Sequence, residues 1–179
     1  MKRLGAIIAG GKASRFGEDK AAAMLDGRPL IEHVAEGLRS QVDQIIICGR
    51  EWPGFDSVAD RPTIDLGPLG GINAALHYAQ QNGFELIVTA GCDVLPVPEM
   101  PMSLDYDKAV FVENHFLFGR WPASLAGSLD LHLNRQSNYS MRHWITTIGA
   151  QPFHLATEVC NLNTQTDLAN YAASLKAPV

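Results

Sequence analysis

Runs of apolar residues alternate with segments of helical periodicity in the first half of the chain. Continuous apolar runs of strand length occupy 4–9, 44–49 and 85–90. Such runs are typical of strands that are buried on both faces of a parallel sheet. Apolar residues recur every three or four positions over 30–38 and 72–81, which predicts helices between these strands. The alternation predicts a three-layer α/β/α sandwich around a mostly parallel, Rossmann-like twisted sheet.

The remaining patterns are shorter and less regular. They predict strands at 57–59, 108–112 and 116–119, helices at 124–133 and 140–148, and an edge strand at 151–155. Thr164 stands three residues before Asp167, a variant of the capping box that predicts a last helix reaching about Leu175. No repeat or linker divides the chain, so we expect a single domain over 1–179.

Composition and charge narrow the class of function. A chain of 179 residues can bury a substantial core, and its formal net charge of −5 includes no block of basic residues. We therefore expect neither nucleic acid nor an anionic membrane as a partner. Cys48, Cys92 and Cys160 are scattered and lack metal-ligand spacing, which suits a reducing cytoplasm. No run approaches the roughly 20 apolar residues of a membrane span.

The loop that follows the first strand is the most informative stretch. Gly10 and Gly11 end the apolar run, and Arg15 and Lys20 follow. Glycines let backbone N–H groups converge on anionic oxygens, while arginine and lysine supply cations that suit phosphate. The P-loop pattern and the dinucleotide-fold pattern Gly-x-Gly-x-x-Gly are both absent. The loop therefore predicts a phosphate site of another class, the alternative being a tight turn with solvated basic residues.

Polar residues follow later strands at the same predicted edge of the sheet. Asp93 comes directly after the strand at 85–90, where its carboxylate could hold Mg²⁺ against a phosphate or simply begin a turn. Asn163 could reach metal or phosphate through its amide oxygen, or cap the last helix. Asp60 and the loop that contains Gly67 and Gly70 could form a flat slot for a base.

A longer string carries a resemblance to a known family. From Ala9 to Lys20 the sequence reads Ala-Gly-Gly-x-x-Ser-Arg-x-Gly-x-Asp-Lys, which resembles the signature of sugar-phosphate and cofactor nucleotidyltransferases. With its length, Cys92-Asp93 and Asn161-Leu162-Asn163-Thr164, the chain most resembles the molybdenum cofactor guanylyltransferases. The resemblance implies a nucleotide-diphospho-sugar transferase type of fold, GTP as donor, molybdenum-bound molybdopterin as acceptor and Mg²⁺ as cofactor. It also implies partners among proteins of cofactor biosynthesis or molybdoenzyme maturation.

The resemblance assigns roles to individual residues. It implies catalytic roles for Arg15, Lys20 and Asp93, and metal ligation by Asp93 and Asn163. It implies nucleotide binding by Ile8, Ala9, Gly10, Gly11, Lys20, Asp60, Gly67, Gly70 and Asp93. The acceptor's pterin and phosphate could lie against Arg120, Trp121, Arg142, His143 and Trp144, the alternative being that the tryptophans belong to the core.

The expected reaction is transfer of GMP from GTP to the phosphate of molybdenum-bound molybdopterin, with release of pyrophosphate. Cys48 stands where this family often has asparagine, which leaves other bases open. A related nucleotidyltransferase that uses CTP or another acceptor phosphate is therefore one alternative. A non-catalytic nucleotide-binding protein with the same fold is another.

Overall fold

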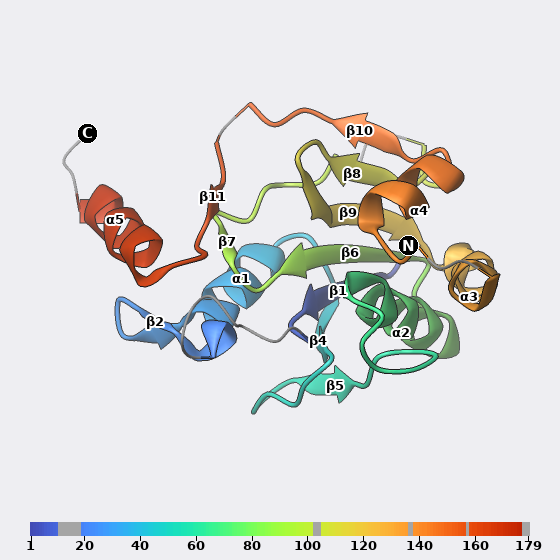
Figure 1. Ribbon diagram of the computed structural model, residues 1–179, viewed down its shortest axis with the longest axis horizontal. Coiled ribbons are helices and arrows are strands. Elements are labelled where there is room, and N and C mark those ends of the chain that lie inside the picture. Colours follow the sequence, from blue (N-terminus) through green and yellow to red (C-terminus); the bar gives the residue numbers. More distant parts are fainter. Residues whose placement is uncertain (11–18, 102–104, 136–137, 157, 177–179) are drawn as a thin grey trace.

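The computed structural model of the protein describes residues 1–10, 19–101, 105–135, 138–156 and 158–176 (Figure 1). These residues form a seven-stranded sheet with the order β10-β8-β9-β6-β1-β4-β5. Its strands are β1 (Arg3–Ile8), β4 (Gln44–Cys48), β5 (Asp56–Val58), β6 (Leu86–Gly91), β8 (Val110–Val112), β9 (His115–Pro122) and β10 (Gln151–Phe153). Gly11 and Arg15, two predicted site residues, lie outside the described residues.

The sheet is mostly parallel, as predicted. β1 pairs with β4 and β6 in parallel, and β5 continues this arrangement on β4. β9 is antiparallel to both of its neighbours, β6 and β8, so β8 again runs in the direction of β6. β10 then pairs in parallel with β8 at the outer edge. The carboxyl ends of six strands therefore lie along one edge of the sheet, which is where open α/β sheets bind ligands.

Helices and two small ladders complete the fold. The α-helices are α1 (Leu30–Leu38), α2 (Pro68–Gln81), α3 (Ala126–Arg135), α4 (Met141–Thr147) and α5 (Gln165–Lys176), and the 3₁₀ turns are η1 (Lys20–Ala22) and η2 (Ala123–Leu125). The ladders pair β2 (Met24–Leu25) with β3 (Arg28–Pro29), and β7 (Val94–Leu95) with β11 (Cys160–Asn161). Figure 1 shows α5 beyond β11, at the opposite end of the view from α3. No helix in the described ranges is both long and apolar enough to cross a membrane.

Two apolar clusters cover the two faces of the sheet. Leu4 and Ala6 of β1 pack in one cluster with the buried side of α2, whereas Ile7 packs in the other with the buried side of α1. This division follows from the period of a strand, in which successive side chains point to opposite faces. Fully burying each large aliphatic side chain contributes about 1.5–3 kcal/mol. The two clusters thus hold the three layers together and leave the carboxyl edge of the sheet free for a site.

Several boundaries differ from the predictions, and for α2 and β9 the physical reason is identifiable. α2 begins at Pro68 rather than at 72, because proline is preorganised for the first turn of a helix and Gly67 ends the preceding loop with φ 61°. β9 extends to Pro122, beyond the predicted 116–119, and includes a charged residue, Arg120. The Arg120 guanidinium is buried and donates to the backbone carbonyls of Pro101 and Asp105, at 3.1 and 2.7 Å.

The aromatic residues suggested for an acceptor site belong to the core. Trp121 and Trp144 are fully buried, and Trp121 Nε1 donates to Thr89 Oγ1 at 2.8 Å. Of the basic residues suggested with them, Arg142 is exposed and lies 5.2 Å from the ring centre of Phe116. The alternative interpretation of the tryptophans, as core residues, is therefore confirmed.

Candidate active site at the carboxyl edge of the sheet

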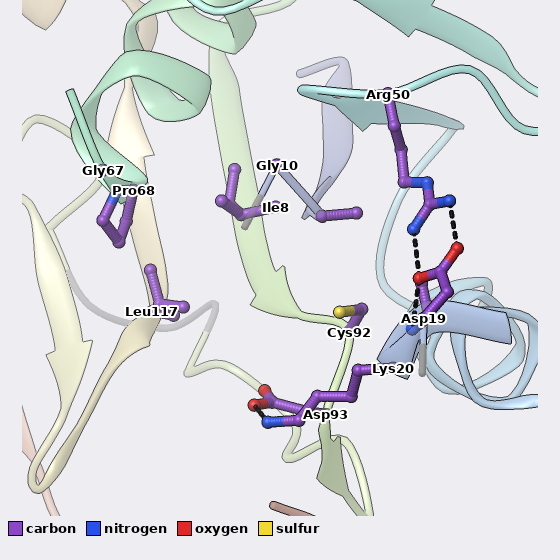
Figure 2. A pocket seen from close by; sticks show the side chains of 12 residues that line it. Ile8, Gly10, Asp19, Lys20, Arg50, Gly67, Pro68, Cys92, Asp93 and Leu117 are labelled. Carbon is purple, nitrogen blue, oxygen red and sulfur yellow. Dashed lines mark hydrogen bonds and ion pairs between the residues drawn. The ribbon is translucent and has the colours of Figure 1, made fainter. Parts of the chain in front are cut away.

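A pocket opens where β1, β4 and β6 end (Figure 2). Figure 2 shows one wall formed by Arg50 and Asp19, and the opposite wall formed by Gly67, Pro68 and Leu117. The residues that line the pocket are Ile8, Ala9, Gly10, Asp19, Lys20, Ala21, Arg50, Gly67, Pro68, Cys92, Asp93 and Leu117. They come from the ends of three parallel strands, the start of α2, the η1 turn and β9. The topology therefore gathers at one place residues that are far apart in the sequence.

The loops after β1 and β4 approach each other closely at two glycines. A Cβ at Gly49 would lie 2.5 Å from Gly10 Cα, and Gly49 has φ +85°. A side chain at either position would separate the loops, and the left-handed backbone at Gly49 independently favours glycine. The Asp60 carboxylate lies beside this crossing, since a Cβ at Gly49 would be 3.1 Å from Asp60 Oδ1. The crossing places the Gly10 backbone on the pocket wall.

Lys20 and Asp93 line the pocket, and Asn163 meets them at the Lys20 ammonium group. Lys20 Nζ donates to Asp93 Oδ2 at 2.7 Å and to Asn163 Oδ1 at 2.8 Å. The Lys20 and Asp93 side chains are 18% and 25% exposed, so the ion pair is shielded from water but still accessible. Three segments separated by 73 and 143 residues thus converge on one ammonium group. This arrangement places one cation and two oxygen ligands beside the Gly10 backbone.

The chain around Asn163 is held by backbone and capping hydrogen bonds. Leu162 N–H donates to the Asp93 carbonyl at 2.8 Å, which joins this segment to the end of β6. Asp167 Oδ2 accepts from the backbone N–H groups of Asn163 and Thr164, while Thr164 Oγ1 accepts from the Asp167 N–H at 3.1 Å. The predicted capping arrangement at the start of the last helix is therefore confirmed. It orients the loop so that the Asn163 amide reaches Lys20.

The cysteines beside the site are unsuited to nucleophilic chemistry. Burial and the charge of Asp93 raise the pKa of Cys92 to about 12, and burial raises the pKa of Cys48 still further. Both thiols therefore stay protonated at neutral pH, and the thiolate is the nucleophilic form. Burial and the charge of Asp65 also raise the pKa of Asp60. Among the described residues, the acidic and basic side chains that line the pocket are those of Asp19, Lys20, Arg50 and Asp93.

The oxygen atoms of Asp93 and Asn163 suit a hard cation. Both accept from the same ammonium group, so their lone pairs converge on one positive centre. A carboxylate and an amide oxygen are ligand types that divalent oxygen-loving cations take, and Mg²⁺ usually adds water and substrate phosphates. In the part of the chain that is described, no group of three or more His, Cys, Asp or Glu could hold a metal ion. Asp93 and Asn163 could therefore contribute two oxygen ligands to a cation whose remaining ligands are water and substrate oxygens.

Most of the predicted nucleotide-binding residues that are described lie together. Ile8, Ala9, Gly10, Lys20, Gly67 and Asp93 all line the pocket. Asp60 and Gly70 are absent from the lining and lie against each other beside Gly10, where the Arg61 N–H donates to the Gly70 carbonyl at 3.1 Å. Asn163 reaches the site through Lys20. The chemical roles of all these residues stay predictions.

Sequence reasoning overlooked Arg50 and the part played by Asp19. Arg50 Nη1 donates to Asp19 Oδ1 at 2.6 Å, and its other terminal nitrogen pairs with Asp19 Oδ2. The hydrogen bonds from Arg50 lower the pKa of Asp19. A signal was present, because Gly49-Arg50 follows a buried parallel strand in the same way as Asp93 does. Leu117 gave no such signal, since it lies inside an apolar run.

Solved structures of nucleotidyltransferases share this fold. Molybdopterin-guanine dinucleotide biosynthesis protein A from Archaeoglobus fulgidus aligns with a TM-score of 0.67 at 18% identity, covering 96% of this chain and 98% of that one. The UTP-bound UGPase from Acinetobacter baumannii aligns with a TM-score of 0.68 at 12% identity, covering 99% and 95%. At such low identity the likeness shows the fold alone. It confirms the predicted nucleotide-diphospho-sugar transferase type.

Sequence comparisons identify the family of the chain. A family model described as "MobA-like NTP transferase domain" matches residues 5–102. The molybdenum cofactor guanylyltransferase of Cereibacter sphaeroides is 32% identical over 193 residues, covering 98% of this chain and 98% of that protein. The protein of the same name from Rhizobium leguminosarum bv. trifolii is 30% identical over 195 residues, covering 97% and 93%. The chain therefore belongs to the MobA-like nucleotidyltransferase family.

Proposed function

We propose that this protein is a Mg²⁺-dependent guanylyltransferase that moves GMP from GTP to the phosphate of molybdenum-bound molybdopterin and releases pyrophosphate. The observation that carries the proposal is the meeting of Lys20, Asp93 and Asn163 beside the Gly10 loop. The two curated relatives named molybdenum cofactor guanylyltransferase support this choice of donor and acceptor, since both align over nearly the whole chain.

In nucleotidyl transfer the protein mainly positions its substrates and neutralises the negative charge of the phosphates. An oxygen of the acceptor phosphate attacks the α-phosphorus of the nucleotide in line. The bond from that phosphorus to the β-phosphate oxygen breaks, and pyrophosphate leaves with the electron pair. The protein supplies no covalent intermediate, which agrees with the protonated state of Cys48 and Cys92.

Each part of the pocket serves one portion of the nucleotide. The Lys20 ammonium neutralises charge on the departing phosphates, and the Gly10 backbone lets the triphosphate approach without a side chain between them. Gly67 and Pro68, opposite Arg50, supply a flat wall against which a base can lie. Asp93 and Asn163 would hold Mg²⁺, which when bound supplies positive charge near the α-phosphate.

The direct test is pyrophosphate release from GTP in the presence of reduced, molybdenum-bound molybdopterin. We expect release with GTP and Mg²⁺, and its loss when EDTA removes the metal. Equal assays with CTP and UTP, joined to calorimetric titration of each nucleotide, test the base. A preference for CTP would make the protein a related cytidylyltransferase. Tight GTP binding without any pyrophosphate release would identify a non-catalytic nucleotide-binding protein.

A further inference from the structure

We propose that Arg50 is a positioning residue for this reaction, and that it acts by holding Asp19 so that the Lys20 side chain stays directed into the pocket, beside Asp93 and Asn163. This inference rests on the proposed function, because the task of Lys20 is defined there. It assigns a role to a residue on the β4 side of the pocket, opposite the start of α2 (Figure 2).

Arg50 and Asp19 form a two-point ion pair. Both terminal nitrogens of Arg50 pair with Asp19, one on each carboxylate oxygen, across 31 residues of sequence. A planar guanidinium that meets a carboxylate in this way fixes orientation as well as distance. The two side chains are 29% and 43% exposed, and ion pairs this exposed add little to folding stability. The pair is therefore better suited to hold a position than to stabilise the fold.

Asp19 connects this ion pair to Lys20. Asp19 is the N-cap of the η1 turn, and its Oδ1 accepts from the Ala21 N–H at 3.2 Å. Lys20 is the first residue of that turn, so its backbone directly follows the residue that Arg50 holds. Its Nζ then reaches Asp93 and Asn163 at 2.7 and 2.8 Å. A rotation of Asp19 would therefore move the base of the Lys20 side chain.

Arg50 is itself well placed to act as an anchor. It follows Gly49, whose N–H donates to the Val58 carbonyl at 2.9 Å and whose backbone packs against Gly10. Its guanidinium also lies 5.5 Å from the ring centre of Trp52, within the range of a cation–π contact. Arg50 thus links the sheet, through β4, to the segment that carries Lys20.

Because Arg50 lines the pocket, a direct contact with the nucleotide is the competing explanation, and a double-mutant cycle separates the two. Arg50→Met keeps the aliphatic stem, and Asp19→Asn keeps a good N-cap while removing the charge. If Arg50 acts through Asp19, each single variant lowers kcat about tenfold, and the double variant is no worse than either one. Effects that multiply in the double variant, or a rise confined to the KM for GTP with Arg50→Met, would overturn the proposal.

A second measurement does not depend on activity. The rate at which an acylating reagent modifies Lys20 can be followed by mass spectrometry, with the exposed Lys108 as an internal reference. We expect Lys20 to react several-fold faster in Arg50→Met and in Asp19→Asn than in the wild type. Arg28→Met, which removes an exposed arginine outside the pocket, serves as the matched control and should change neither rate nor kcat.

The two measurements distinguish failure of this inference from failure of the proposed function. An unchanged rate of Lys20 modification in both variants overturns the positioning role, whatever happens to turnover. A wild-type protein that does not transfer GMP contradicts the proposed function, and faster labelling in the two variants would still show that Arg50 holds Lys20 in place. Melting temperatures of all variants, measured alongside, should stay within a few degrees of the wild type.

Discussion

Replacing Lys20 with methionine should abolish most of the activity and leave the fold intact. Methionine keeps an unbranched apolar side chain and removes only the ammonium group. That group lies 2.7 Å from Asp93 and 2.8 Å from Asn163, so it is already held at the site before any substrate binds. A preorganised donor of this kind stabilises a transition state by about 2.7–4 kcal/mol. At about 1.4 kcal/mol for each factor of ten, we expect kcat to fall by about 100–1000-fold.

The effect on folding should be much smaller. Lys20 and Asp93 are 18% and 25% exposed, so water can hydrate the Asp93 carboxylate once its partner is gone. Partly exposed ion pairs contribute about 0–1 kcal/mol, which sets the expected loss in the free energy of unfolding. The site therefore predicts a large change in rate together with a small change in stability.

The assay for this prediction is single-turnover release of pyrophosphate at saturating GTP and acceptor, with urea unfolding measured on the same samples. Lys108→Met is the matched control, because Lys108 forms an ion pair of 3.7 Å with Asp105 on an exposed turn away from the pocket. The control should keep wild-type kcat. A Lys20→Met protein that turns over within threefold of the wild type would show that Lys20 does not serve the reaction.

Three further predictions concern the metal, the loop crossing and pH. Asp93→Asn keeps the shape of the side chain but removes its charge. We therefore expect kcat to fall at least about a hundredfold, and we expect Mg²⁺ titration no longer to change the affinity for GTP. A normal dependence of GTP affinity on Mg²⁺ would contradict this prediction. In urea unfolding, Gly49→Ala should destabilise the protein by roughly 2 kcal/mol more than Gly54→Ala. Both glycines have positive φ, but of the two only Gly49 has a close neighbour, with Gly10 Cα 2.5 Å from the new Cβ. Equal losses in the free energy of unfolding would refute the close approach. Burial and the charge of His143 lower the pKa of the buried His132. The His132 imidazole therefore binds a proton more readily in the unfolded chain than in the folded protein. The free energy of unfolding should fall as pH drops below about 6.5. His132→Phe should flatten the melting temperature between pH 8 and 5.5, and an unchanged slope would rule out this histidine as the cause.

Much of the parallel half of the fold could be predicted because its signals are local. A strand buried on both faces, such as β4, is a continuous apolar run, and a helix such as α1 shows its apolar stripe directly. The β7 and β11 ladder could not be found in this way, because each strand has two residues and shows no period. β9 was predicted too short, because the burial of Arg120 depends on carbonyls that tertiary structure brings to it.

The contacts of the candidate site were likewise predictable only in part. Lys20 and Asp93 could be proposed to meet, because loops after parallel strands share one edge of the sheet. The same rule places Arg50 at this edge, because it follows β4, but its partner could not be predicted, since the pairing with Asp19 depends on how closely two loops approach each other. For Trp121 the sequence left open a flat ligand or the core, and burial in the folded chain decides for the core. Residue types in the sequence suggested candidate site residues, and the fold determined which of them lie together.

The most direct test of the central claim is a crystal structure of the protein with a non-hydrolysable GTP analogue and Mg²⁺. The account predicts the triphosphate against the Gly10 backbone, with a phosphate oxygen within hydrogen-bond distance of Lys20 Nζ and the metal on the Asp93 carboxylate. A triphosphate bound elsewhere, with Lys20 still paired to Asp93 and Asn163 and no metal between them, would contradict it.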